Sequence, residues 1–486
     1  MKTAFFSYLK IAAILSCSLP IFANAASKIL EHRQPEYPAS FEDQLIYHRA
    51  FEVVIWAVPM VNTLHLREEL QKHGVKNGTL AYLGSPPSSK TELPTYNNTT
   101  PYVFGSVSLS DGPMVIEIPP VSDKAKYFGT VFNIWDSAIE DFGPAGIDKG
   151  KGGRFVVTPP NWKGIIPKGY QKLKSTSFDI HFLLRSVPAK DGEQGWDDAV
   201  KYSKNLKLYP LADAASPKAN EWFDVTKIDG YFHGVPHFDI STFKLINTYV
   251  QEEFVQEYDK PMHGMLGFLG IEKGKPFNPD KKIEKILDQA ARDAETYMRS
   301  KLQNGDPFTD YWPDKNWGIM RLSPEVMSSL ATWNFDDRLD YHARAIDYYY
   351  LGVGIPKRFA GNKGAAFYLF ATVDDRGEVL DNRKTYRLHV PAGVPASDFW
   401  SLILYSTRTR SFTDSSKFGL SSKDNLQKNT DGSVDLYIGP KPPDGKKVNW
   451  LETKAGDGLI LCFRIYGPTK PIRDNTWKLS NLEMIE

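Results

Sequence analysis

The stretch Phe178-Asp179-Ile180-His181-Phe182 decides the fold. Its apolar and polar residues alternate strictly, and this period of two is the pattern of a half-buried β-strand. Apolar runs at 114–118 and 127–135 predict further strands, and proline pairs at 119–120 and 159–160 separate such runs. Short strands divided by proline and glycine predict an antiparallel sandwich between about residues 102 and 187.

Helical patterns lie on both sides of this β-region. Upstream, Ser40 and Asp43 resemble a capping box, and apolar residues then recur at helical spacing until Pro59 ends or kinks the helix. Downstream, helices dominate from 222 to 352, and residues 340–351 predict the last of them. The clearest amphipathic face consists of Ile283, Ile286, Leu287, Ala290, Ala294, Tyr297 and Met298.

Strand patterns return after residue 365 and continue to the end of the chain. The predicted strands are 367–373, 385–390, 400–405, 434–438 and 458–466. We therefore predict a mainly β protein with a helical middle region. The predicted domains are an N-terminal helix plus β-sandwich domain (26–215), a helical middle domain (216–355) and a C-terminal β domain (356–486).

The first 25 residues have the order of parts of a signal peptide. Lys2 gives a positive start, and residues 11–22 are largely apolar but too short to span a bilayer. The small residues around Asn24 then predict cleavage after Ala25 and a periplasmic or secreted mature protein. The alternatives are a lipoprotein anchored at Cys17 and a buried N-terminal helix. No other apolar run is long enough for an integral membrane span.

Composition excludes several classes of protein. The 59 Lys and Arg residues balance 58 Asp and Glu residues over 486 positions, which argues against a nucleic-acid partner. Aromatic residues make up 13 % of the chain, and this argues against disorder. After cleavage Cys462 would be the remaining cysteine, so no internal disulfide would form. Cys462 lies in an apolar run, which predicts an inert buried thiol.

The sequence lacks the common catalytic signatures. It contains no G-x-S-x-G elbow, phosphate-binding P-loop, G-x-G-x-x-G fingerprint, H-E-x-x-H motif or C-x-x-C pair. Nucleotide-driven work and the zincin and α/β-hydrolase mechanisms are therefore disfavoured, and no cofactor is predicted.

An ordered set of short motifs resembles two bacterial families of exported proteins. The set resembles the domain of unknown function numbered 1214 and, upstream, its usual partner numbered 1254. Its members are Asn133-Ile134-Trp135-Asp136, Pro160 to Gly164, Phe399-Trp400-Ser401, Asn429 to Ser433, Asn449-Trp450-Leu451, Arg464 to Pro468 and Trp477. The resemblance implies an immunoglobulin-like sandwich, a helical middle region and a C-terminal jelly-roll-like sandwich. It implies no activity, because a fold does not fix a function.

The strongest N-terminal site hypothesis places acids beside an aromatic residue. Trp135 and Asp136 precede Glu140 and Asp141. The aromatic ring with its acids predicts a sugar or cation site, and Asp136 with Asp141 could serve as a catalytic carboxylate pair. The alternative is a turn with solvated acids and Trp135 in the sandwich core.

Two histidines and an acid form the candidate metal site. His233, His237 and Asp239 lie within seven residues and are ligand types for a divalent metal ion. Gly234 and Pro236 exclude the helical geometry that would make the two imidazoles converge. The alternative is therefore a pair of ordinary loop histidines.

Two further pairs are candidate ligand-binding residues. Tyr341 and Arg344 share one face of a predicted helix, where Arg344 could hold an anionic ligand or pair with acids at 336–340. Trp450 and Arg464 could line a pocket on the C-terminal sandwich, or Arg464 could stack on Trp450 and staple the sheet.

These observations leave three classes of function open. The first is an envelope protein that binds a small molecule or glycan on aromatic-lined sandwich surfaces. The second is a carboxylate- or metal-assisted envelope hydrolase, and the third is an assembly role as a homo-oligomer.

Overall fold

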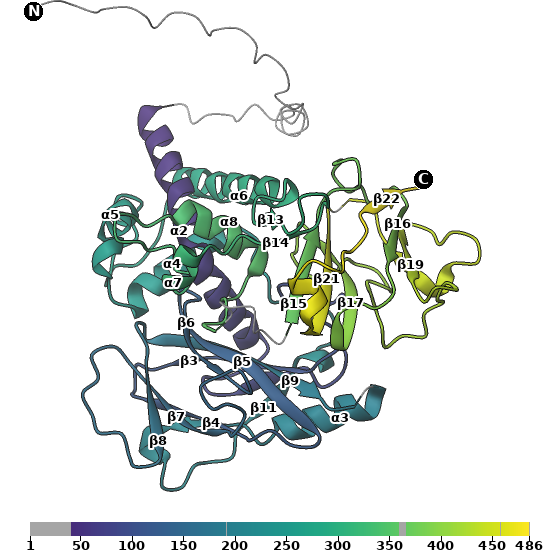
Figure 1. Ribbon diagram of the computed structural model, residues 1–486. Helices are drawn as coiled ribbons and strands as arrows, with labels where there is room; N and C mark the ends of the chain where they lie inside the picture. Colours follow the sequence, from purple (N-terminus) through teal and green to yellow (C-terminus); the bar gives the residue numbers. More distant parts are fainter. Residues whose placement is uncertain (1–39, 191, 359–365, 457, 486) are drawn as a thin grey trace, which may run out of the picture.

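The computed structural model describes residues 40–190, 192–358, 366–456 and 458–485. The predicted signal peptide, its cleavage site and Cys17 lie outside these described residues. Three bodies pack around a long central helix, with a sandwich below, helices beside it and a second β-region to the right in Figure 1. Among the described residues no helix is both long and apolar enough to cross a membrane.

The N-terminal β-region is a sandwich of two sheets. The larger sheet has the order β11-β1-β3-β9-β5-β6, and the smaller has the order β10-β4-β7-β8. Most neighbours are antiparallel, but β1 pairs β11 and β7 pairs β8 in parallel. The strands are β1 (Leu80–Tyr82), β3 (Tyr102–Ser108), β4 (Met114–Ile118), β5 (Ala125–Asn133), β6 (Ala138–Phe142), β7 (Gly153–Thr158), β8 (Tyr170–Lys174), β9 (Asp179–Pro188), β10 (Lys207–Pro210) and β11 (Trp222–Asp224).

Strand β9 is buried on both faces, so the expectation of a half-buried strand is wrong. Ile180 and Phe182 enter the sandwich core as their apolar character predicts. The opposite face carries Asp179 and His181, which are only 2 % and 6 % exposed. The reason is that the central helix and the turn after β5 cover this face, where Asp179 contacts Arg67 of that helix and His181 contacts Asp136 of that turn instead of solvent.

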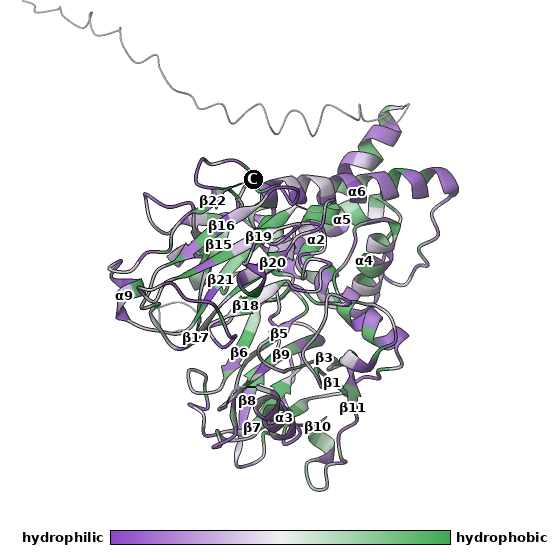
Figure 2. Ribbon diagram, turned by 90° about the vertical axis from the view of Figure 1, so that its right-hand side faces the viewer, coloured by the Kyte–Doolittle hydropathy of each residue, from purple (hydrophilic) through white to green (hydrophobic). Residues whose placement is uncertain are grey.

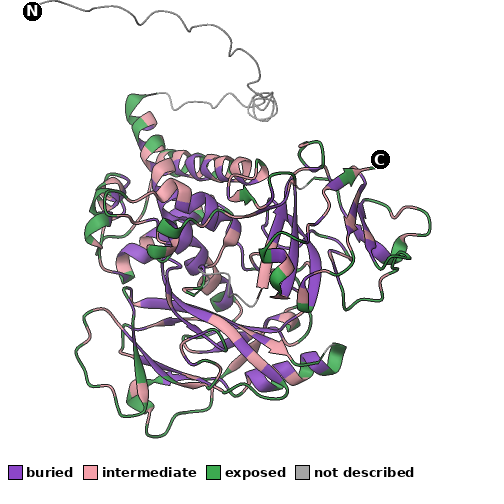
Figure 3. Cartoon of the chain, in the orientation of Figure 1, coloured by how far each residue is buried: buried purple, intermediate pink, exposed green. Residues whose placement is uncertain are grey.

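The central helix is α2 (Phe41–Lys72). Ser40 caps it by accepting a hydrogen bond from the backbone N–H of Asp43, as the capping pattern predicts. The helix runs through Pro59 for more than three further turns, so an end at Pro59 is wrong, whereas a kink there stays a prediction. Tertiary packing outweighs the lost backbone hydrogen bond, because the residues around Pro59 are fully buried against α4, α5, α6 and α8. Figure 3 shows α2 changing from exposed at its start to buried.

The helical middle region surrounds α2. Helix α6 keeps Leu287, Ala290, Ala294 and Met298 inside, and its remaining surface is mostly hydrophilic (Figure 2). Asp340 caps the helix predicted at 340–351, and Gly352 ends it at φ 62°. The helices of this region are α4 (Ile240–Glu252), α5 (Lys260–Phe268), α6 (Lys281–Gln303), α7 (Pro324–Ser328) and α8 (Tyr341–Leu351). Outside it, α3 (Gly192–Ser203) packs on β5 and β9, α9 (Lys470–Arg473) follows the last long strand of the C-terminal β-region, and short β2 (Thr91–Glu92) pairs with β12 (Phe232–His233).

The C-terminal β-region also has two sheets. Their orders are β13-β14-β15-β21-β17-β18 and β20-β19-β16-β22. Cys462 lies in β21 as a fully buried free thiol, and burial raises its pKa. The strands are β13 (Phe308–Asp310), β14 (Gly318–Met320), β15 (Ala366–Ala371), β16 (Tyr386–Val390), β17 (Ala396–Ser406), β18 (Gly419–Ser421), β19 (Val434–Gly439), β20 (Trp450–Glu452), β21 (Leu459–Pro468) and β22 (Leu482–Met484).

The observed class is therefore mainly β with a helical middle region, as predicted. The two β-regions do not lie apart from the helices, because α2 contacts β3 and the strands β13 and β14 extend the C-terminal sheet. The domain boundaries at 215 and 355 stay a prediction.

Candidate functional site: a cavity at the junction of three regions

A cavity of about 290 Å³ lies where the N-terminal sandwich, the helices and the C-terminal sheet meet. Its walls come from α2, from strands β3, β5, β9, β15 and β21, and from the loop that follows α8. Most of the wall is apolar, with contributions from Leu66, Phe104, Phe132, Leu183, Leu322 and Phe370. Residues far apart in the sequence therefore build one concave surface to which all three regions contribute.

Asp136 enters this cavity wall from the turn between β5 and β6. The side-chain amide oxygen of Asn133 accepts the backbone N–H groups of Trp135 (2.9 Å) and Ser137 (3.0 Å) and so holds the turn closed. Asp136 takes φ 58° there, a left-handed conformation that aspartate tolerates better than most residues. The local sequence thus fixes the direction of the Asp136 side chain.

Asp136 forms an ion pair with His181 inside the wall. The distance from Asp136 Oδ1 to His181 Nε2 is 2.8 Å, and His181 Nδ1 lies 3.4 Å from the Thr63 hydroxyl. The imidazole also stacks on Phe132. Burial raises the pKa of Asp136, although His181 opposes this shift. A carboxyl group and an imidazole with one proton to share are a proton-transfer pair.

Asp141 also lines the cavity, but it serves as an anchor. It accepts hydrogen bonds from the Thr130 hydroxyl (2.7 Å) and from the backbone N–H groups of Lys357 (3.1 Å) and Arg358 (2.6 Å). Glu140 pairs with the Arg358 guanidinium at 2.9 Å. These contacts tie the loop after α8 to β6. The structure brings Asp136 and Asp141 to the same cavity, but the closest partner of Asp136 is a histidine.

Arg464 is the third predicted site residue in the cavity wall, and Arg185 faces it from the other β-region. The predicted partner of Arg464, Trp450, lies elsewhere in β20 and donates its indole N–H to the carbonyl of Gly439 (2.9 Å). Arg464 instead places its guanidinium 4.8 Å from the ring centre of Tyr368. Sequence reasoning missed Arg185, although it lies on the same face of β9 as Asp179 and His181.

Trp135 and Arg344 do meet, but in the helical core and not in the cavity. The Arg344 guanidinium lies 5.0 Å from the Trp135 ring centre, and its Nη2 donates to the Trp56 carbonyl (2.8 Å). Desolvation lowers the pKa of Arg344. Tyr341 points away and donates to Glu52 (3.0 Å). Among the described residues, no acid at 336–340 forms an ion pair with Arg344.

The residues of the predicted metal site have separate partners. His233 contacts Glu92 (2.7 Å), and His237 lies 3.9 Å from Glu295. Asp239 caps α4 through the backbone N–H of Ser241. Within the part of the chain that the structure describes, no group of three or more His, Cys, Asp or Glu side chains is placed to hold a metal ion.

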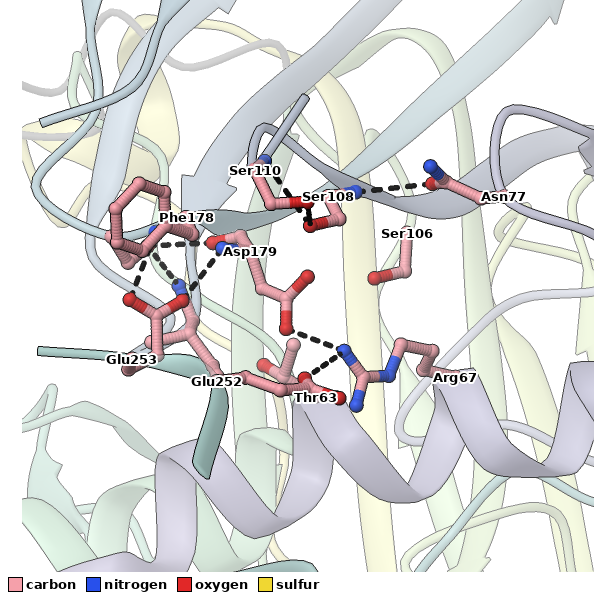
Figure 4. A network of polar contacts seen from close by, with 12 residues as sticks. Thr63, Arg67, Asn77, Ser106, Ser108, Ser110, Phe178, Asp179, Glu252 and Glu253 are labelled. Carbon is pink, nitrogen blue, oxygen red and sulfur yellow. Dashed lines mark hydrogen bonds and ion pairs between the residues drawn. The ribbon is translucent and has the colours of Figure 1, made fainter. Parts of the chain in front are cut away.

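A second hollow, of about 500 Å³, lies at the other end of the polar face of β9. Figure 4 shows Arg67 of α2 reaching Asp179 and Glu252, with the Arg67–Glu252 distance at 2.8 Å. The carboxylate of Glu253 accepts the backbone N–H groups of Phe178 (2.9 Å) and Asp179 (2.6 Å). Burial raises the pKa of Asp179 to about 7, against the opposing charge of Arg67. This network fastens β9 to α2 and α4.

Each of the two β-regions matches a known protein family. Residues 78–210 match the family described as a protein of unknown function, DUF1254, and residues 365–470 match the one described as a protein of unknown function, DUF1214. The chain pairs a DUF1254 domain with a DUF1214 domain. Both domains, in this order, agree with the resemblance read from the sequence motifs. The cavity thus lies between the DUF1254 strands and the DUF1214 strands.

One solved structure shares the overall fold of this DUF1254–DUF1214 chain. The VPA0106 protein from Vibrio parahaemolyticus is similar over 91 % of this chain and 100 % of its own, with a TM-score of 0.54 and 14 % identity. An uncharacterised protein from Burkholderia cenocepacia covers 91 % of this chain and 97 % of its own at 12 % identity, with a TM-score of 0.39. No curated protein matches the chain.

Proposed function

We propose that this protein binds a small, largely apolar molecule in the cavity between its DUF1254 and DUF1214 domains. The observation that carries the proposal is the shared cavity wall, because both domains and α2 each contribute to it. Ligand sites favour concave apolar surfaces with a few convergent polar groups, and they occur preferentially between domains. A glycan is less suited to this wall, since each buried sugar hydroxyl needs a polar partner.

A filled cavity tests this proposal. Ala366 of β15 lines the cavity and is half-buried, so Ala366→Leu adds volume where the ligand would lie. Ala396 of β17 is an equally half-buried alanine of the same sheet outside the cavity wall, and Ala396→Leu is the matched control. We expect apolar probes to raise the melting temperature of the wild type and of Ala396→Leu, but not of Ala366→Leu.

The size of the expected stabilisation follows from the coupling between ligand binding and folding. A ligand at a hundred times its dissociation constant stabilises the folded state by about 2.7 kcal/mol. A panel of aliphatic and aromatic probes that leaves the wild-type melting temperature unchanged would contradict the proposal. So would a panel that stabilises wild type and Ala366→Leu equally, because the probes would then bind elsewhere.

A second candidate function is acid–base catalysis in the same cavity. The observation that favours it is the 2.8 Å contact between Asp136 and His181 in a wall that a ligand would touch. An envelope hydrolase would use this pair in place of the pair of carboxylates expected from the sequence. Turnover of an ester, phosphoester or glycoside panel by the wild type, lost in His181→Gln, would support it. A wild type that turns over none of these substrates would contradict the catalytic function and leave only the binding function.

A further inference from the structure

Two arginines from different domains converge on one part of the cavity. Arg185 belongs to β9 of the DUF1254 domain, and Arg464 belongs to β21 of the DUF1214 domain. Each lies opposite a tyrosine of the neighbouring strand, since Arg185 pairs in register with Tyr102 and Arg464 with Tyr368. All four side chains line the cavity. The same arginine–tyrosine arrangement thus approaches the cavity from both sides of the domain junction.

The charges of these arginines are not balanced by acids. Arg464 is only 3 % exposed, and its Nη2 donates to the Thr95 carbonyl and the Tyr405 hydroxyl. Arg185 donates to the hydroxyls of Tyr102 (3.2 Å) and Tyr368 (3.4 Å). Among the described residues no carboxylate pairs with either arginine, and the electrostatic neighbours of Arg185 are tyrosines and Arg464. Guanidinium groups stay protonated, and buried charges without a counter-charge are costly.

The tyrosines add hydrogen-bond donors to this positive site. The Tyr102 oxygen accepts from Arg185 and from Asn97 (2.8 Å), and the Tyr368 oxygen accepts from Arg185. Neither phenolic proton has an acceptor among the described residues. Two guanidinium groups and two phenolic hydroxyls therefore offer donors to one acceptor from the cavity. Such convergent, charge-assisted donors are what an anionic group requires.

The acids that line the cavity do not neutralise the charges of Arg185 and Arg464. Asp136 is engaged with His181, and Asp141 is engaged with Thr130 and the loop after α8. Among the described residues of the cavity wall, the remaining arginine is Arg358, which is paired with Glu140. The two unpaired charges are therefore confined to the part of the wall built by Arg185 and Arg464.

We infer that Arg185 and Arg464, with Tyr102 and Tyr368, bind the carboxylate of an organic acid whose apolar body fills the rest of the cavity. The inference rests on the proposed function and adds the chemical class of the ligand. A carboxylate matches the planar guanidinium groups, and one apolar chain or ring matches the phenylalanine- and leucine-rich wall. The charge is held by both domains, so the ligand would bridge them.

The positive charges of the two arginines also change the pKa of Tyr368. Burial alone would raise the pKa of the Tyr368 hydroxyl, but Arg185 and Arg464 outweigh burial and hold that pKa below its ordinary value. An anion bound between the arginines would offset their charge and raise the pKa of Tyr368 again. This change gives a spectroscopic signal at the site, because ionised tyrosine absorbs at longer wavelength than neutral tyrosine.

Matched probes on the full chain test the inference. Octanoate and phenylbutyrate are compared with octanol, octylamine and octyl phosphate by calorimetric titration of the wild type, Arg185→Met and Arg464→Met. Arg410→Met is the control, because Arg410 is a buried arginine that lies over Tyr349 (4.2 Å) and near Glu295 (3.6 Å) outside the cavity wall. Arg464→Lys tests rescue by a retained charge.

We expect the wild type and Arg410→Met to bind carboxylates at least about tenfold more tightly than octanol, as charge-assisted hydrogen bonds imply. The Met variants in the cavity should bind octanol as before and lose this preference, with partial recovery in Arg464→Lys. Carboxylate binding should also shift the Tyr368 titration to higher pH, and Tyr368→Phe should remove that signal.

The possible failures are distinguishable. Equal binding of octanoate and octanol, or an unchanged preference in both Met variants, would overturn the inference while the cavity stays a binding site. A preference for octyl phosphate over octanoate would overturn the carboxylate class. Binding of none of these probes, in a protein that also fails the wider panel of the cavity-filling experiment, would overturn the proposed function with it. A Met variant that fails to fold is replaced by Arg464→Lys and Tyr368→Phe, whose lack of effect on the preference would count against the inference.

Discussion

Asp347 lies on the buried side of α8 and is only 1 % exposed. Burial raises the pKa of its carboxyl to about 8, against the weaker opposing charge of Arg321. The folded protein therefore holds a proton that the unfolded chain has already lost above about pH 4, and stability falls as pH rises from about 4 to about 8. Asp347→Asn removes this titration without changing the side-chain shape.

We expect Asp347→Asn to gain stability relative to the wild type as pH rises. The gain in the free energy of unfolding between about pH 5 and pH 8 should be at least about 1 kcal/mol. Urea titrations at several pH values measure it. A difference that stays constant with pH would show that Asp347 does not titrate in this window.

Residues 178–182 show which structural features the residues of one strand can predict and which they cannot. Their alternation correctly gives the strand and the side on which Ile180 and Phe182 lie. It cannot show that a helix more than a hundred residues upstream covers the other side. Asp179 and His181 therefore resemble solvent-facing residues in the sequence, although both are in buried ion pairs. His181 and Arg185 share one face of this strand and both line the cavity, and that pairing is the sequence signal that reasoning from single residues missed.

At the scale of elements, the loop after α8 controls the cavity wall. A methyl group added at Gly354 would come within 2.2 Å of the Asp136 carbonyl oxygen and 2.3 Å of the Phe132 ring. Gly354→Ala should lower the free energy of unfolding by about 1–3 kcal/mol, because a packed wall must shift. Its ligand affinity should fall as well. Thermal melts and probe titrations measure both effects.

Gly264 in α5 provides the matched control. A methyl group there meets nothing within 4 Å, so Gly264→Ala should be neutral or should stabilise the helix by up to about 1 kcal/mol. Equal effects of the two substitutions would contradict the close contact between the loop and Asp136.

Secondary structure was the part most open to sequence reasoning. The stop signal at Gly352 correctly gave the end of α8, whereas Asp340, predicted as its first residue, caps the helix from outside. One alternating stretch and several apolar runs gave core strands of both β-regions. The expected helix end at Pro59 was wrong because proline breaks a helix only where the helix lacks other support, and here tertiary packing buries α2 around Pro59. The pairing of β9 with β3, and of β21 with β15, has no signature within either strand.

At the scale of the whole molecule, the cavity depends on the docking of two β-regions. Tyr405 of β17 donates to the backbone carbonyl of Tyr96, and Asn97 donates to Tyr102 and Tyr466 (3.2 Å), so the segment around residues 95–97 joins the domains. A carboxylate held by Arg185 and Arg464 would reinforce this junction. We therefore expect a bound carboxylate to slow proteolysis between the two β-regions, and limited digestion with and without octanoate measures this. An unchanged digestion pattern at saturating octanoate would contradict the bridging role.

The most direct measurement is a crystal structure of the full chain with the tightest-binding carboxylate of the panel. We expect the carboxylate to lie between the guanidinium groups of Arg185 and Arg464, with its apolar part along Phe132, Leu183 and Phe370. A ligand bound outside this cavity, or bound in it with its carboxylate turned away from both arginines, would contradict the proposed carboxylate site.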